Sequence, residues 1–251
     1  GTTNIAIGGI ALDANQTGIS NVAIGYNSLG DNTGSYNTAV GRDTLGNNSS
    51  GEQNVAIGYQ CLDSNTTANN NTGVGFQALQ ANTTGTNNVA TGAYSLDANT
   101  TGSGNVASGR SSLGANTTAS NNTAFGHHAL LLNTTGANNV AVGANALDAN
   151  TTASYNFALG VDALGANTTG SVNVAIANSL TSNTTGGSNV AVGSNSLGDN
   201  TTGSQNVALG RQALGDNTTA NDNTAVGHNA MLLNTTGTEQ VAVGSIALDA
   251  C

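Results

Sequence analysis

The side chains that could do chemistry in this chain are few and widely spaced. Its 251 residues include three histidines, His127, His128 and His228, and two cysteines, Cys61 and Cys251. His127 and His228 occupy the same position in two copies of a repeat that lie six copies apart. At about 4.8 Å per stacked strand that is roughly 29 Å, too far to share a metal ion. The adjacent His127 and His128 could bind a metal weakly, but an exposed pair in a turn is the simpler interpretation.

The two cysteines predict no intramolecular disulfide. Cys61 replaces an Ala or Ser of the repeat, so we expect it to be a small, inert packing residue. Cys251 lies eleven copies further along, far beyond the roughly 7 Å that a disulfide can bridge. A bridge between Cys251 residues of separate chains stays open.

The aspartates fall at two positions of the repeat. The tenth position carries Asp13, Asp63, Asp97, Asp148 and Asp249, and the eleventh carries Asp31, Asp199 and Asp216. Only Asp199 and Asp216 occupy the same position in neighbouring copies, and the Gly-Gly-x-Gly-x-Asp calcium repeat is absent, so solvated turn carboxylates are favoured over calcium ligands. Without a Ser-His-Asp order or a paired-carboxylate cleft, we predict no enzyme, no catalytic residue, no metal site and no cofactor.

The composition is typical of an ordered repeat. Charged residues make up 6 % of the chain, against about 25 % in an ordinary domain. The apolar residues recur in strict register, which argues against disorder. The net charge of −10 and the presence of only three arginines argue against nucleic-acid binding. No apolar run approaches the roughly 20 residues of a transmembrane helix, so this segment is not expected to insert into a membrane.

One sequence motif fills the chain. The consensus is N-V-A-[VI]-G-x-x-[AS]-L-x-x-N-T-T-G-x-x, numbered here as positions 1 to 17, and two copies have 16 residues. Copies start at Asn4, Asn21, Asn37, Asn54, Asn71, Asn88, Asn105, Asn122, Asn139, Asn156, Asn173, Asn189, Asn206, Asn223 and Gln240. Two short apolar runs and two turns per copy predict one coil of an all-β, parallel β-solenoid, with two short strands in each coil. Fifteen coils would extend roughly 70 Å.

Individual positions of the repeat have separate roles. The fifth position is Gly in fourteen of fifteen copies, which is typical of a corner with positive φ. The short copy that runs from Ile176 directly to Ala177 lacks this Gly and should build its corner differently. The ninth position is Leu in every copy except the one with Met231, so it should be the coil interior.

Asn at the twelfth position should form hydrogen bonds from coil to coil. This predicted structural Asn ladder includes Asn65, Asn82, Asn99, Asn116, Asn133, Asn150 and Asn167. The N-T-T triplets also match the N-glycosylation sequon, but a glycan on every coil would not fit, so turn chemistry is favoured. Thr pairs such as Thr66 and Thr67 could form ice-binding ranks, although consecutive residues face opposite ways.

The first strand of each copy is apolar on both faces. At residues 22–24, 55–57 and 140–142, the second and fourth positions point to one face and Ala at the third position points to the other. Since a coil has one interior, we predict that the Ala face is buried by other copies of the chain. This predicted interface consists of Ala6, Ala23, Ala39, Ala56, Ala90, Ala107, Ala124, Ala141, Ala158, Ala175, Ala191, Ala208, Ala225 and Ala242.

Residues 1–251 are interpreted as a single repeat tract, expected to be a segment of a longer fibre protein because both ends fall inside a copy. Residues 206–236 are similar to residues 105–135, which indicates duplication in blocks of six copies. The "NVAIG" and "NTAVG" segments resemble the head repeats of trimeric autotransporter adhesins, which are left-handed parallel β-rolls. The unit "NTAVG…AL…NTTG" is even more similar to repeat tracts of phage-tail-fibre-like proteins. The adhesin repeat is shorter, by about the N-T-T turn.

The resemblance implies a homotrimer, so the expected partner is the chain itself, with a host cell-surface glycan or protein as a further candidate. We predict a non-enzymatic structural segment of an extracellular trimeric fibre, such as a phage tail fibre that carries host-receptor recognition. The alternative is a bacterial surface adhesin that binds a host or matrix partner. A third possibility is a monomeric ice- or carbohydrate-binding solenoid.

Overall fold

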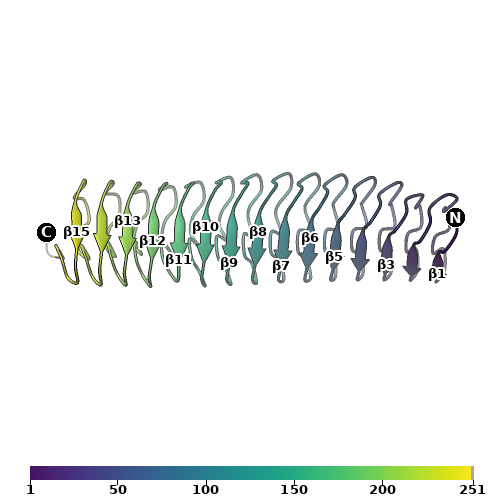
Figure 1. The fold of residues 1–251 in the computed structure, drawn as a ribbon, viewed down its shortest axis with the longest axis horizontal. Helices are drawn as coiled ribbons and strands as arrows, with labels where there is room; N and C mark the ends of the chain where they lie inside the picture. The colour runs from purple at the N-terminus through teal and green to yellow at the C-terminus, as the bar shows by residue number, and fades with distance from the viewer. Residues whose placement is uncertain (250–251) are drawn as a thin grey trace. The chain divides into compact units, whose positions relative to one another are not determined.

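The computed structural model describes residues 1–249, and they form a parallel β-solenoid whose coil is the 17-residue repeat (Figure 1). The chain divides into two compact units, Gly1–His127 and His128–Cys251. The boundary falls inside the repeat copy that starts at Asn122. Both units are built from the same coil, and each unit has its own stack of strands.

Each coil contributes one strand of three residues. In the first unit these are β1 (Ile5–Ile7), β2 (Val22–Ile24), β3 (Thr38–Val40), β4 (Val55–Ile57), β5 (Thr72–Val74), β6 (Val89–Thr91), β7 (Val106–Ser108) and β8 (Thr123–Phe125). In the second they are β9 (Val140–Val142), β10 (Phe157–Leu159), β11 (Val174–Ile176), β12 (Val190–Val192), β13 (Val207–Leu209), β14 (Thr224–Val226) and β15 (Val241–Val243).

Within each unit the strands pair in chain order, parallel, with like positions opposite one another. Ala39 of β3 pairs with Ala56 of β4, and Ala158 of β10 pairs with Ala175 of β11. The predicted coil-on-coil stacking is therefore confirmed within both units. The strands are short because Gly at the fifth position ends them: Gly58 has φ = 133°, and a Cβ there would lie against the carbonyl oxygen of Gly75.

The prediction of a second strand in each coil is wrong for the described residues. The run at positions eight and nine is a turn in which Leu takes the left-handed conformation, as at Leu62 with φ = 53°. A left-handed non-Gly residue costs about 1–2 kcal/mol. Leu62 is completely buried, which stabilises the fold by about 1.5–3 kcal/mol. Its N–H still donates to Ala78 in the next coil at 3.0 Å, so this segment remains bonded from coil to coil.

The coil that lacks the corner Gly does turn differently, as expected. Ala177 stands at this corner with φ = 71°, whereas the corner glycines lie between 124° and 143°. Its N–H donates to the carbonyl oxygen of Leu159 at 2.7 Å. The coil-to-coil hydrogen bond is thus kept although the corner is one residue shorter.

The prediction that the Ala side chains at position three form an exposed interface is wrong. From Ala23 to Ala225 they have no exposed surface, and Ala242 is 4 % exposed. Ala6 is exposed because β1 pairs on one side only, with β2. The cause is the width of the coil: Leu at position nine and Asn at positions one and twelve fill the interior, so the strand has room there for a methyl group only.

Two columns of buried Asn hold the interior together. At position twelve, Asn65 Nδ2 donates to Asn48 Oδ1 at 2.7 Å, and Asn99 Nδ2 donates to Asn82 Oδ1 at 2.8 Å. The same amides donate within their own coil, as Asn65 does to the Ala68 carbonyl oxygen at 3.1 Å. All seven residues of the predicted ladder are buried, and hydrogen bonds between neighbours of the ladder occur in both units.

At position one Asn also bonds from coil to coil, and some steps include an amide-to-amide bond, such as that from Asn54 Nδ2 to Asn37 Oδ1 at 3.2 Å. The side-chain oxygen accepts a hydrogen bond from the backbone of the next coil, as Asn37 Oδ1 does from the N–H of Asn54 at 2.9 Å. The amide Nδ2 of Asn54 then donates to the Ala68 carbonyl oxygen at 2.9 Å, the acceptor that Asn65 also uses. The two Asn columns therefore close each coil across its interior as well as linking it to the next.

One pair of residues shows how tightly the interior is filled. Cys61 is the only Cys at position eight, and Gly73, at position three of the next coil, is the only Gly in the Ala column. A Cβ on Gly73 would lie against Cys61 Sγ, well inside van der Waals contact. The larger sulfur atom of one coil is thus matched by a missing methyl group in the next.

This match predicts strong coupling between the two positions. Gly73→Ala alone should destabilise the chain by about 1–3 kcal/mol through overpacking. In the Cys61→Ala background the same change should be neutral or stabilising, because Ala is preferred over Gly in a strand by about 0.5–1 kcal/mol. Denaturant unfolding of the four chains of this cycle measures the coupling energy. Additive effects of the two substitutions would contradict the packing account.

The Asn ladder predicts a large loss of stability from one substitution. Asn99 donates to Asn82 and to the Gly102 carbonyl oxygen and accepts from Asn116, all in the interior. Asn99→Ala should lower the free energy of unfolding by roughly 2–5 kcal/mol, since buried partners lose their hydrogen bonds at about 1–3 kcal/mol each. The control is Thr101→Ala at an exposed position of the same coil, which should change it by less than about 0.5 kcal/mol. Equal effects would contradict a structural ladder.

Candidate functional site

The outer face of the strands is the first candidate surface, because it carries the large side chains that the interior excludes. Residues on either side of the buried Ala point outward, and Ile57 is 40 % exposed. In the first unit this face also includes exposed Ile24, Val74, Val89 and Phe125, and in the second Phe157, Leu159, Leu209, Val241 and Val243. The unpartnered apolar face that the sequence predicts therefore exists, on the opposite side of the strand from the one expected.

A line of aromatic side chains is the second candidate surface. Tyr26, Tyr59, Phe76 and Tyr94, called here the aromatic strip, come from the corner that follows β2, β4, β5 and β6, and they are 54 %, 38 %, 43 % and 37 % exposed. The ring centroids of Tyr59 and Phe76 lie 5.3 Å apart with planes 17° from parallel. Phe76 and Tyr94 meet edge to face at 5.2 Å. Arg42 fills the corner between Tyr26 and Tyr59, with its guanidinium carbon 5.7 Å from the Tyr26 ring centroid.

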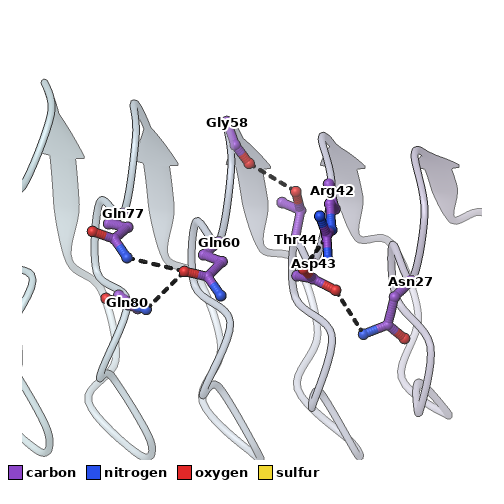
Figure 2. A network of polar contacts seen from close by, with 8 residues as sticks. All are labelled: Asn27, Arg42, Asp43, Thr44, Gly58, Gln60, Gln77 and Gln80. Atoms are coloured by element: carbon purple, nitrogen blue, oxygen red, sulfur yellow. Dashed lines mark hydrogen bonds and ion pairs between the residues drawn. The ribbon is translucent and has the colours of Figure 1, made fainter.

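Position seven, the next residue after the corner of the aromatic strip, is polar on four successive coils, and Figure 2 shows these side chains together with Gln80 of position ten. Gln60 Oε1 accepts from Gln77 Nε2 at 2.9 Å and from Gln80 Nε2 at 3.2 Å. Asn27 Nδ2 donates to Asp43 Oδ1 at 3.2 Å, and Arg42 Nε lies 3.1 Å from Asp43 Oδ2. The amide and carboxylate groups are thus fixed by bonds between coils.

The sequence prediction missed the aromatic strip, although part of its signal was present. Tyr26, Tyr59 and Phe76 all occupy position six, while Tyr94 occupies position seven. The column of the first three can be read from the repeat alignment. That Tyr94 joins them depends on the corner geometry, because Ala93 at position six of its coil leaves room for the neighbouring ring.

The histidines at position six contact arginines of the preceding coil. His127 Nε2 lies 3.5 Å from Arg110 Nη1 in the first unit, and His228 Nε2 lies 3.3 Å from Arg211 Nη1 in the second. The similar blocks 105–135 and 206–236 thus carry the same contact. Among residues 1–249, no group of three or more His, Cys, Asp or Glu side chains is arranged to hold a metal ion.

Three aspartates of position ten lie partly buried. Burial raises the pKa of Asp63, and the nearby charge of Asp43 raises it further. Burial also raises the pKa of Asp97 and Asp148, while backbone N–H groups of the same turn partly oppose the shift. These carboxylates are turn residues, as expected, but they are partly buried and not fully solvated.

In ten of the eleven N-T-T triplets the Asn is buried, the first Thr is half-buried and the second Thr is exposed, and in the last triplet both threonines are exposed. Asn65 has no exposed surface, so this sequon is not available for glycosylation in the folded chain. Thr66 is half-buried and its hydroxyl donates to the Thr83 carbonyl oxygen at 3.1 Å. Thr67 is exposed. The exposed threonines therefore form one rank at position fourteen and not two.

Cys61 is a packing residue, as the sequence predicts. It is a free, fully buried cysteine, and burial raises the pKa of its thiol to about 12. A thiol in this environment is inert because it does not form the thiolate at neutral pH. The expectation for Cys251 lies outside the described residues.

The raised pKa of Asp97 predicts a pH-dependent stability. The folded chain binds this proton more tightly than the unfolded chain, whose Asp has the usual pKa of 3.8, so stability is lost as pH rises from about 3.8 through the raised folded value. Asp97→Asn should therefore raise the melting temperature at pH 7. At pH 3 the variant and the parent should melt together. A stabilising effect of the same size at both pH values would contradict the electrostatic origin.

Among residues 1–249 there is no helix with the length and apolar character needed to cross a membrane. No protein-family model matches the chain, and no curated protein matches it significantly.

Proposed function

We propose that this chain is a non-enzymatic structural segment of an extracellular homotrimeric fibre, such as a phage tail fibre that carries host-receptor recognition. The observation that carries the proposal is the apolar outer face of the strands in both units. A soluble monomer rarely leaves a contiguous apolar surface of more than a few hundred Å² open to water. Other copies of the chain are the simplest partner, because a repeated face can contact the same face repeatedly.

The corrected strand orientation changes which residues form the contact. The Ala column is already buried inside the coil, so association would use the side chains of positions two and four, including Val55 and Ile57. Eight stacked coils give this face a length of about 38 Å in the first unit. Three such faces meeting along one axis would bury their apolar side chains against one another. The number three comes from the resemblance of the repeat to trimeric fibres and adhesins.

The bonding within each unit is consistent with a mechanical role. Neighbouring coils are linked by strand pairing, by bonds between Asn side chains and by Thr hydroxyls such as that of Thr66. The chain has no Lys and only three Arg, so it offers few sites to trypsin-like proteases. Both properties suit a segment that works outside a cell.

The alternative proposal is a bacterial surface adhesin, and one observation favours it. The aromatic strip is exposed on the wall of the first unit, where a host or matrix molecule could reach it. In that case the coils would bind the partner themselves. In the fibre proposal, recognition is carried by the fibre of which the chain is a segment.

The test is the absolute mass in solution by light scattering at several concentrations. A stable mass near three times 24.5 kDa is expected. The double variant Ile57→Asp, Val192→Asp places a carboxylate on the outer face of each unit and should shift the mass toward 24.5 kDa. The matched control is Thr67→Asp, Thr202→Asp, which adds the same charges to the exposed fourteenth position of the same coils and should remain trimeric.

Two outcomes would overturn the proposal. A parent mass of 24.5 kDa at all concentrations would exclude the homotrimer. A trimeric parent whose mass is unchanged by the outer-face variant would show that the strand face is not the contact.

A further inference from the structure

We propose that the aromatic strip and its neighbouring amides form a binding site for a neutral polysaccharide chain. The site consists of Tyr26, Tyr59, Phe76 and Tyr94 with Gln60, Gln77 and Gln80 beside them. This inference goes beyond the structural role proposed above, because it concerns the side wall of the first unit and does not depend on the oligomeric state.

The fold does not need these aromatic rings. The chain has eight Phe and Tyr residues (3 Phe, 5 Tyr), and four of them are in this line on five successive coils. In the second unit position six carries Ala144, Val161, Ser194, Arg211 and His228, yet the strands have the same length and register. Rings that are 37–54 % exposed and unnecessary for the coil are best explained by a ligand.

The geometry of the rings suits the C–H groups of a sugar. Coils lie about 4.8 Å apart, so rings on neighbouring coils cannot lie flat side by side and must lean against one another. The nearly parallel Tyr59 and Phe76, with centroids 5.3 Å apart, are arranged in this way. Leaning rings present a corrugated apolar surface on which the apolar face of a pyranose can rest.

The amides supply the polar half of the site. A primary amide has two N–H donors and a carbonyl acceptor. Gln77 and Gln80 each use one donor on Gln60, which holds them in place and leaves their carbonyl oxygens for a ligand. Fixed donors and acceptors beside an aromatic surface are what the hydroxyl groups at the edge of a sugar ring require.

The repeat distance favours a polysaccharide over a peptide. From Tyr59 to Tyr94 the strip has one ring per coil, at about 4.8 Å, and one hexose unit of an extended polysaccharide is about as long. An extended peptide returns to the same face only every two residues, about 6.8 Å. A polyproline II peptide does so every three residues, about 9.3 Å. Successive rings could therefore meet successive sugars, whereas a peptide would fall out of step within two coils.

The charges favour a neutral chain over an acidic one. The net charge is −10 and there is no Lys. The one cation in the strip, Arg42, is paired with Asp43 at 3.1 Å. An acidic polysaccharide would be repelled, while the hydroxyl groups of a neutral one can bond to the phenols and amides of the site.

The test is native gel electrophoresis of the full chain in gels cast with soluble galactomannan, barley β-glucan or dextran, with hyaluronan as the acidic comparison. At least one neutral polysaccharide should retard the chain and hyaluronan should not. Phe76→Ala and Tyr59→Ala should each weaken the retardation about tenfold, the size expected for one lost stacking contact. Phe76→Tyr keeps the ring and should retain binding.

Two controls separate the strip from general effects. Tyr155→Ala removes a tyrosine that is 64 % exposed but belongs to the second unit and not to the strip, and it should not change retardation. Light scattering of Phe76→Ala should give the parent mass, whichever mass that is, so this test is independent of the trimer test. The proposal is wrong if no neutral polysaccharide retards the chain, if Phe76→Ala and Tyr155→Ala behave alike, or if Phe76→Ala changes the mass.

Discussion

In this fold every residue stacks on its counterpart one strand spacing away, and this constraint governs which side chains the chain can use. Asn satisfies it best in the interior, because an amide has both a donor and an acceptor and can bond to a copy of itself. Asn48, Asn65 and Asn82 form such a series in the first unit. A buried Ser or Thr can link coils by bonding to the backbone of the next coil. A carboxylate has only acceptors and an ammonium group has only donors, so neither can bond to a copy of itself.

The same constraint accounts for the low charge of the chain. Two like charges stacked at about 4.8 Å repel by about 1 kcal/mol even in water, and by more where they are partly buried. The aspartates of position ten follow this rule, because Asp63 and Asp97 are separated by the coil that carries Gln80 at that position. Asp63 is still close enough to Asp43 for its pKa to be raised by that charge. The 6 % of charged residues is consistent with this rule, to which Asp199 and Asp216 at position eleven of neighbouring coils are an exception.

Much of the fold could be predicted from the sequence, since the period, the parallel pairing and the register all follow from aligning the copies. The orientation of the strand could not. Alternation assigns Val55 and Ile57 to one face and Ala56 to the other, but both faces are apolar, so the pattern is equally consistent with either orientation. The volume of the interior decides between them, and that volume depends on how Leu62 and the two Asn columns fill the coil. The size match between Cys61 and Gly73 could not be predicted either, because it depends on the contact between neighbouring coils.

Among the turns, too, one could be predicted from the sequence and another could not. Gly58 indicated its corner because Gly is the residue that tolerates φ = 133° without strain. Leu62 adopts φ = 53° although Leu disfavours it, and nothing in local propensity predicts that. Burial of the side chain outweighs the backbone cost, so tertiary packing sets this corner.

The candidate sites lie at the repeat positions whose side chains take no part in the interior stacking. Between Gly58 and Leu62 the chain leaves the interior, and Tyr59 and Gln60 at positions six and seven point outward. The interior columns alone close the coil. Position six can therefore carry Arg, His, Ser or Val in place of Tyr without disturbing the strands, as the second unit demonstrates. The interior residues cannot vary, and they hold the corners at a fixed spacing. Because the corner residues can vary freely, a repeat protein can acquire a binding site there at little cost in stability. The aromatic strip occupies these corners in the first unit, which is why we assign binding to the corners and structure to the interior.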